Sequence, residues 1–194
     1  MTTWQKCSPV CSGDFIIIAI SGTPGTGKTL VAKLLAKEIK AKLISISELA
    51  KKGKIPYTID KKRKSKIIDE NDLQKFINTE IAKNEKNVIE GHMAHFLVSD
   101  YVFVLRASPR TLETRLKERK WSKNKIKENI EAEIIDEITI EAKKMHKNVF
   151  EIDTSSISVK ETVDNIIKIL KKHNHRKHPK FIDWTQDYAN FLEN

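Results

Sequence analysis

Gly22-Thr-Pro-Gly-Thr-Gly-Lys-Thr29 is a complete match to the phosphate-binding pattern Gly-x-x-x-x-Gly-Lys-Thr. Such a loop needs glycines because successive backbone N–H groups must turn inward to wrap a phosphate. A continuous apolar run at residues 15–20 precedes the loop and predicts a buried strand. An amphipathic helix is predicted after the loop, with an apolar side formed by Leu30, Val31, Leu34, Leu35 and Ile39. This context indicates a site for a nucleoside triphosphate.

Two side chains of the loop have expected chemical tasks. The ammonium of Lys28 would reach the β- and γ-phosphate oxygens, and the hydroxyl of Thr29 would bind Mg²⁺. The dipole of the helix that begins at Lys28 adds to the attraction for phosphate. We therefore expect Mg²⁺ to accompany ATP at this site.

A carboxylate ends the strand predicted at residues 87–90, and a histidine follows two residues later. A phosphate-loop site needs a carboxylate at the end of a neighbouring strand to hold Mg²⁺ or its waters, and Glu90 occupies that place. His92, in the loop above the phosphates, could orient or deprotonate a water. Thr29 and Glu90 are thus the predicted metal ligands. The alternatives are a strand-capping carboxylate and an ordinary loop histidine; His95 is predicted to be structural.

Four of the six arginines lie within one short window, in a chain that otherwise uses lysine. The clustering of Arg106, Arg110, Arg115 and Arg119 favours bidentate phosphate contacts or stacking on a base. Arg115 and Arg119 would share a helix face, so that Arg119 could stack on adenine while Arg115 reaches phosphate. A helix break soon after Arg119 predicts a short basic lid at about residues 118–128. For Arg110 a solvated helix face is favoured.

Strands and helices alternate along the rest of the chain, which predicts parallel strand–helix–strand units. Further strands are predicted at residues 43–46, 101–105 and 149–152, and helices at residues 71–84, 108–119, 124–146 and 159–172. The expected fold class is α/β, with a five-stranded parallel sheet, helices on both of its faces and a short lid. A chain of 194 residues with 39% hydrophobic residues is sufficient for one such core.

Charge and cysteine content limit the classes of partner and of site. The 36 lysines and arginines exceed the 26 acidic residues, so the net charge is +10. Two basic stretches, residues 51–66 and 171–180, favour a polyanion such as RNA, with a merely lysine-rich surface as the alternative. Two cysteines, Cys7 and Cys11, exclude a disulfide framework and a four-cysteine zinc site. The longest apolar run is too short to span a bilayer, and we expect a cytoplasmic location without membrane contact.

These motifs resemble the nucleoside monophosphate kinases and, more narrowly, the adenylate kinase isoenzyme six family of small-ribosomal-subunit assembly. The narrower resemblance depends on the Glu-x-His element of Val88-Ile-Glu-Gly-His92 and on Lys127-Glu-Asn-Ile-Glu-Ala-Glu133, and Arg115-Leu-Lys-Glu-Arg119 also matches. Ile182-Asp-Trp184 is a weaker match. The resemblance covers roughly residues 16–170.

The resemblance implies a three-layer P-loop kinase fold, and the residue pattern predicts a division of the chain. A flexible leader (1–13) would precede the kinase domain (14–172), and a basic C-terminal tail (173–194) would follow it. Within the domain, the monophosphate-binding segment would lie at about residues 45–70 and the lid at about 118–128.

The resemblance also implies what the chain does. It implies adenylate kinase activity (ATP + AMP to 2 ADP) and ATP hydrolysis, in small-ribosomal-subunit biogenesis, with a platform ribosomal protein as partner and contact with rRNA. Lys28, His92 and Arg119 would be catalytic. ATP would be held by Gly25, Thr26, Gly27, Lys28, Thr29, Leu30 and Arg119.

Two other functions fit the same residues. The first is a nucleotide-gated assembly chaperone for a ribosomal protein, whose turnover only times release of a partner. The second is a small-molecule kinase of the shikimate or gluconate type, which shares the loop and the lid. That enzyme needs an aspartate base near the acceptor, which Glu90 and Asp69 do not obviously provide.

Overall fold

The computed structural model describes residues 15–55, 57–60, 65–83, 85–171, 181–186 and 188. The predicted leader, residues 1–13, lies outside this part of the chain. The same holds for residues 61–64 of the first basic stretch and for all of the second except Lys171.

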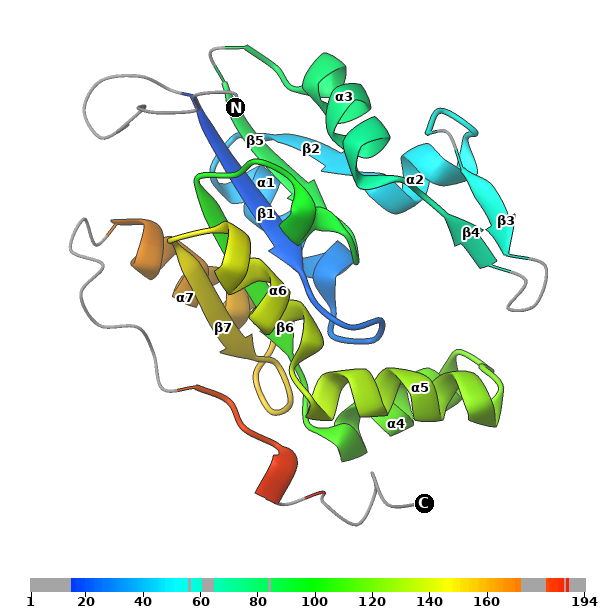
Figure 1. Ribbon diagram of the computed structural model, residues 1–194. Helices are drawn as coiled ribbons and strands as arrows, with labels where there is room; N and C mark the ends of the chain where they lie inside the picture. Colours follow the sequence, from blue (N-terminus) through cyan, green and yellow to red (C-terminus); the bar gives the residue numbers. More distant parts are fainter. Residues whose placement is uncertain are drawn as a thin grey trace.

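A five-stranded parallel sheet forms the centre of the fold, in the order β2-β5-β1-β6-β7 (Figure 1). Its strands are β1 (Ile16–Ser21), β2 (Lys42–Ser45), β5 (Lys86–Glu90), β6 (Tyr101–Arg106) and β7 (Val149–Asp153). Each pair of neighbours is parallel, so the carboxyl ends of all five strands meet at one edge, where ligands bind in such sheets. The predicted fold class is confirmed.

Helices cover both faces of this sheet. They are α1 (Lys28–Glu38), α2 (Ile46–Lys51), α3 (Glu70–Glu80), α6 (Glu137–Met145) and α7 (Val159–Lys171), with a short 3-10 helix η1 (Ala94–Phe96), whereas α4 (Pro109–Glu118) and α5 (Lys123–Ile134) pack on one another. Ile18 and Ile20 of β1 pack with α1 and α7, whereas Ile17 and Ala19 pack with α3 and α6. Successive side chains of a strand point to opposite faces, so β1 is apolar on both faces from Ile16 to Ile20. No described helix is both long and apolar enough to cross a bilayer.

The segment that follows β2 contains a helix and two strands that the sequence pattern did not predict. Helix α2 begins after Ser45, whose hydroxyl accepts a hydrogen bond from the backbone N–H of Glu48 at 3.3 Å. This is a Ser-x-x-Glu helix start, a local signal that was available in the sequence. Strands β3 (Thr58–Asp60) and β4 (Ser65–Ile67) then pair antiparallel in a separate hairpin. Three-residue strands are too short for an alternating pattern to be recognised.

The single helix predicted at residues 124–146 is wrong, because the chain forms α5 and α6 with a sharp turn between them. Asp136 at this turn has a φ of 59°, a left-handed conformation that ends the first helix. Both Glu133, at the end of α5, and Asp136 bind the side chain of Arg106. The turn therefore brings two carboxylates to one arginine, which the stripe of apolar residues along the segment could not indicate.

Arg106 is not available for phosphate, contrary to its grouping with the other clustered arginines. The residue is 1% exposed at the end of β6. Its Nε atom donates to Glu133 at 2.6 Å, and Nη1 contacts Asp136 and, at 3.3 Å, Glu151 of β7. Burial of a guanidinium is costly unless carboxylates surround it, so this arginine organises the protein interior. Arg110, by contrast, is exposed as expected.

The described end of the predicted tail packs against the helices that follow β6. Trp184 and Tyr188 contact a cluster formed by Leu112, Leu116, Ile126, Ile130 and Ile134 of α4 and α5. The backbone N–H of Ile182 donates to Glu151 at 3.1 Å. This short segment therefore binds both the buried arginine cluster and the apolar side of the helix pair.

Candidate functional site

The glycines of the loop at residues 22–29 adopt conformations that other residues rarely take. Gly22, Gly25 and Gly27 have φ angles of 137°, 100° and 94°. A Cβ atom on Gly22 would lie 2.3 Å from the carbonyl oxygen of Leu105, and one on Gly25 would lie 2.7 Å from Leu112. The loop can therefore pass tightly between β6 and α4 only because these positions lack side chains.

Lys28, the first residue of α1, points back into this loop. Its Nζ atom donates to the carbonyl oxygens of Gly22 at 2.6 Å and Thr23 at 3.0 Å. Loss of hydration lowers the pKa of this ammonium to about 8, with a smaller lowering effect from Arg119, while Glu90 and Glu133 oppose the shift. A bound triphosphate would place anionic oxygens next to this dehydrated ammonium, whose present hydrogen-bond acceptors are carbonyl oxygens.

Two oxygen side chains lie together beside Lys28. The hydroxyl of Thr29 is 3.4 Å from Oε2 of Glu90, which is itself 2% exposed at the end of β5. The second oxygen of Glu90 accepts a 2.5 Å hydrogen bond from the hydroxyl of Ser45, at the end of β2. A hydroxyl and a carboxylate are the oxygen donors that Mg²⁺ prefers, so the predicted pair fits the metal in chemical type.

His92 follows in the loop after β5 and is exposed. The neighbouring protein atoms and the ammonium of Lys28 lower the pKa of its imidazole, although a contact with the backbone of Gly22 opposes the shift. The ring is therefore neutral near pH 7, as a proton acceptor must be. The structure thus brings His92 and Lys28 to the same strand edge, as the sequence predicted.

His95 is enclosed in the protein, which supports the structural role expected for it. Its Nδ1 atom lies 2.9 Å from the hydroxyl of Ser21 and its Nε2 atom 3.0 Å from Glu141 of α6. The hydroxyl of Ser21 also donates to the carbonyl oxygen of His92 at 3.0 Å. His95 therefore helps to fix the loop that carries His92.

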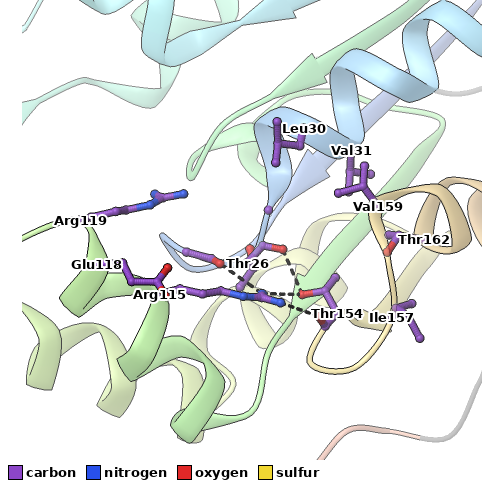
Figure 2. Close-up of a pocket in the computed structure, with 12 residues that line it drawn as sticks. Thr26, Leu30, Val31, Arg115, Glu118, Arg119, Thr154, Ile157, Val159 and Thr162 are labelled. Atoms are coloured by element: carbon purple, nitrogen blue, oxygen red, sulfur yellow. Dashed lines mark hydrogen bonds between the residues drawn. The ribbon is translucent and has the colours of Figure 1, made fainter.

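A cavity of about 290 Å³ opens beside the loop, between α1, the end of α4 and the turn after β7 (Figure 2). Leu30, Val31, Ile157 and Val159 provide apolar walls, and the other lining residues are Gly25, Thr26, Gly27, Arg115, Glu118, Arg119, Thr154 and Thr162. A cavity with apolar walls and polar groups next to a phosphate loop suits a nucleobase. The predicted residues Gly25, Thr26, Gly27, Leu30 and Arg119 thus lie around one space.

The two arginines that were expected to share a helix face, Arg115 and Arg119, differ in their contacts. Arg119 is exposed at the end of α4 and extends toward the loop (Figure 2). Arg115 instead donates to the carbonyl oxygen of Gly25 at 3.3 Å and to that of Thr154 at 2.7 Å. The donors of Arg115 thus serve the protein backbone, and this arginine ties α4 to the loop. Thr154 was missed, because nothing local in its sequence marks it.

The chain is similar to a known domain family and to several archaeal proteins. The family model described as "AAA domain" matches residues 18–136. A protein of Methanocaldococcus jannaschii named "Putative adenylate kinase" is 42% identical over 176 residues, which span 90% of this chain and 96% of that relative. Relatives of the same name from Thermococcus onnurineus and Pyrococcus furiosus are both 38% identical, over 92% and 91% of this chain and 96% of their own length. The chain therefore belongs to the AAA-domain family, and it is a P-loop kinase.

Solved structures support the fold of this kinase. A shikimate kinase from Acinetobacter baumannii superposes with a TM-score of 0.58 at 15% identity, over 82% of this chain and 96% of that one. A protein of uncharacterised function from Eubacterium ventriosum gives a TM-score of 0.54 at 19% identity, over 82% and 100%. At such low identity the likeness extends to the fold alone.

The kinase should lose ATP affinity when the loop ammonium is removed. We expect Lys28→Ala to weaken ATP binding by about 10- to 100-fold, because a charge-assisted contact with phosphate is lost. Lys33→Ala is the matched control, since Lys33 lies exposed on the same helix and pairs with Glu48 at 3.9 Å. Isothermal titration calorimetry measures both. Equal ATP affinities in the two variants would contradict the assignment of the loop.

Proposed function

We propose that this kinase transfers the γ-phosphoryl group of ATP to AMP and, with water as acceptor, hydrolyses ATP. The observation that carries the proposal is the convergence of Lys28, Glu90 and His92 at one strand edge, next to a cavity for a base. In the transfer, the bond between the γ-phosphorus and the β–γ bridging oxygen breaks. A bond to a phosphate oxygen of AMP forms, and both products are ADP.

In this proposal the triphosphate lies in the loop and adenine lies in the cavity. The backbone of Gly25 and Gly27 approaches both regions, because these glycines line the cavity and belong to the loop. Arg119 would cover the nucleotide by stacking on the base or by pairing with phosphate. The apolar floor of Val31 and Val159 would exclude water from one side of the base.

Thr29 and Glu90 would hold Mg²⁺ in the loaded enzyme. When bound, the metal supplies charge neutralisation to the phosphate oxygens. Lys28 would exchange its present carbonyl partners for phosphate oxygens and stabilise the charge of the transferring group. His92, held neutral by its surroundings, would orient the attacking water or accept a proton from it.

The acceptor side of the site is proposed at the segment of residues 45–70. This segment begins at Ser45, whose hydroxyl binds Glu90, so its first residue touches the proposed metal ligand. The name of the archaeal relatives also supports AMP as the acceptor. Arg63 is the one arginine of the segment, and it lies outside the described residues.

His92→Ala tests the reaction directly. We expect wild-type protein to form ADP from ATP plus AMP, and ADP plus inorganic phosphate from ATP alone. The variant should lower kcat by about 10- to 1000-fold while the ATP dissociation constant changes little, because the imidazole acts on the acceptor rather than on the base. Coupled assays of ADP and of inorganic phosphate give both rates.

Two outcomes of these assays would contradict parts of the proposal. An unchanged kcat in the variant would leave His92 without a catalytic role. ADP formation that AMP does not accelerate, but that shikimate or gluconate does, would replace the nucleotide acceptor with a small molecule. Hydrolysis that depends on an added ribosomal protein, without transfer to AMP, would favour the assembly chaperone.

We also propose that the enzyme acts in small-ribosomal-subunit biogenesis in the cytoplasm, in contact with a platform ribosomal protein and rRNA. The sequence resemblance and the net charge of +10 support this proposal. Basic side chains that neutralise backbone phosphates bind RNA without reading its bases.

The basic segment provides the test of RNA contact. Changing Lys61, Lys62, Arg63 and Lys64 together to Ala should weaken binding of rRNA fragments and flatten its salt dependence, because fewer counterions are released. ATP hydrolysis without a partner should be retained. Filter binding at several salt concentrations measures the affinity. An unchanged affinity with an unchanged salt slope would leave the segment as ordinary surface.

A further inference from the structure

Glu133, a carboxylate that the proposed reaction does not use, contacts the phosphate loop directly. It lies near the end of α5 and is 2% exposed. Its Oε2 atom accepts a 2.5 Å hydrogen bond from the hydroxyl of Thr23, a loop residue 110 positions away. Its Oε1 atom accepts from Nε of Arg106 at 2.6 Å and from the backbone N–H of Ala107 at 3.2 Å. One side chain thus joins α5, the end of β6 and the loop.

The charges of this buried cluster do not require Glu133 for balance. Arg106 also pairs with Asp136 and Glu151, and Lys143 pairs with Glu151 at 2.8 Å. In the cluster, therefore, two cations face three carboxylates. The negative charge of Glu133 also acts on the loop. Glu133 is one of the two carboxylates whose charge favours the ammonium form of Lys28. Neutralising Arg106 alone does not explain the presence of Glu133.

Thr23 is the loop residue on which the other internal contacts depend. Its carbonyl oxygen accepts from Nζ of Lys28 at 3.0 Å and from the hydroxyl of Thr26 at 2.9 Å. The backbone N–H of Thr26 reaches the same oxygen at 3.2 Å. Because Glu133 fixes the side chain of Thr23, it also fixes the orientation of the peptide that Lys28 and Thr26 bind.

We propose that Glu133 is a positioning residue that acts through Thr23 to hold the phosphate loop ready for a triphosphate. Because Glu133 lies on α5, whose first residues belong to the expected lid at about residues 118–128, this contact also links that helix to the loop. Loss of the contact leaves the peptide of Thr23 free to reorient, and binding must then restore its order. The inference takes its ligand, ATP, from the proposed function.

A set of near-isosteric variants tests this inference through ATP affinity. Thr23→Val removes the hydroxyl and leaves the bond between Glu133 and Arg106 intact, whereas Thr23→Ser keeps the hydroxyl. Glu133→Gln keeps one oxygen for Arg106 and removes the charge. Asp136→Asn is the matched control, because Asp136 binds the same arginine but does not contact the loop. Thermal midpoints show that each variant is folded.

We expect Thr23→Val and Glu133→Gln each to weaken ATP binding about tenfold, in line with the loss of one charge-assisted hydrogen bond. The double variant should also lose about tenfold rather than about a hundredfold, since both changes act on the same contact: Thr23→Val removes its donor, and Glu133→Gln replaces its charged acceptor with a neutral amide. Thr23→Ser and Asp136→Asn should stay within about twofold of wild type, the usual scatter of changes outside a shared contact. Calorimetric titration with ATP provides every value.

Several results would overturn the inference. Additive losses in the double variant would show that Glu133 and Thr23 act independently. A loss with Asp136→Asn equal to that with Glu133→Gln would assign the effect to the stability of the arginine cluster. Unchanged ATP affinity in Thr23→Val would overturn this inference alone, whereas a wild-type protein that fails to bind ATP would overturn the proposed function as well.

Discussion

The paired burial of Arg106 is the interaction on which the rest of the site depends. A guanidinium at 1% exposure would be strongly destabilising without partners. The chain supplies them from three places: the end of α5, the turn at Asp136 and strand β7. Helix α5 must therefore end where it does, and the chain must turn through a left-handed residue to begin α6. Helix α5 gains its attachment to the sheet from this arrangement.

That attachment fixes the phosphate loop from its outer side. Glu133 holds Thr23, and Arg115 of α4 holds Gly25 together with Thr154. From the inner side, the central strand β1 and helix α1 determine where the loop begins and ends. A loop held in this way keeps its N–H groups oriented before a ligand arrives, which reduces the entropic cost of binding. The cavity proposed for the base lies beside the second attachment, because Gly25, Arg115 and Thr154 all line it (Figure 2).

The sequence predicted the parts of this arrangement that depend on local pattern. The central strand, the glycine loop and the pairing of Thr29 with Glu90 follow from apolar runs and from motif spacing, and the structure contains them. The α5–α6 turn, the burial of Arg106 and the contacts of Glu133 depend on residues far apart in the chain. No local pattern separates a carboxylate that binds a buried arginine from one that faces solvent.

In the proposed function, the loop, the segment after β5 and the end of α4 contact one nucleotide. Hydrogen–deuterium exchange with and without a non-hydrolysable ATP analogue and Mg²⁺ tests it most directly, because bound amides exchange more slowly. We predict slower amide exchange in residues 22–29, 90–92, 115–119 and 154–159, and unchanged exchange in helix α3. Slower exchange in the loop alone, or none in any of these segments, would contradict it.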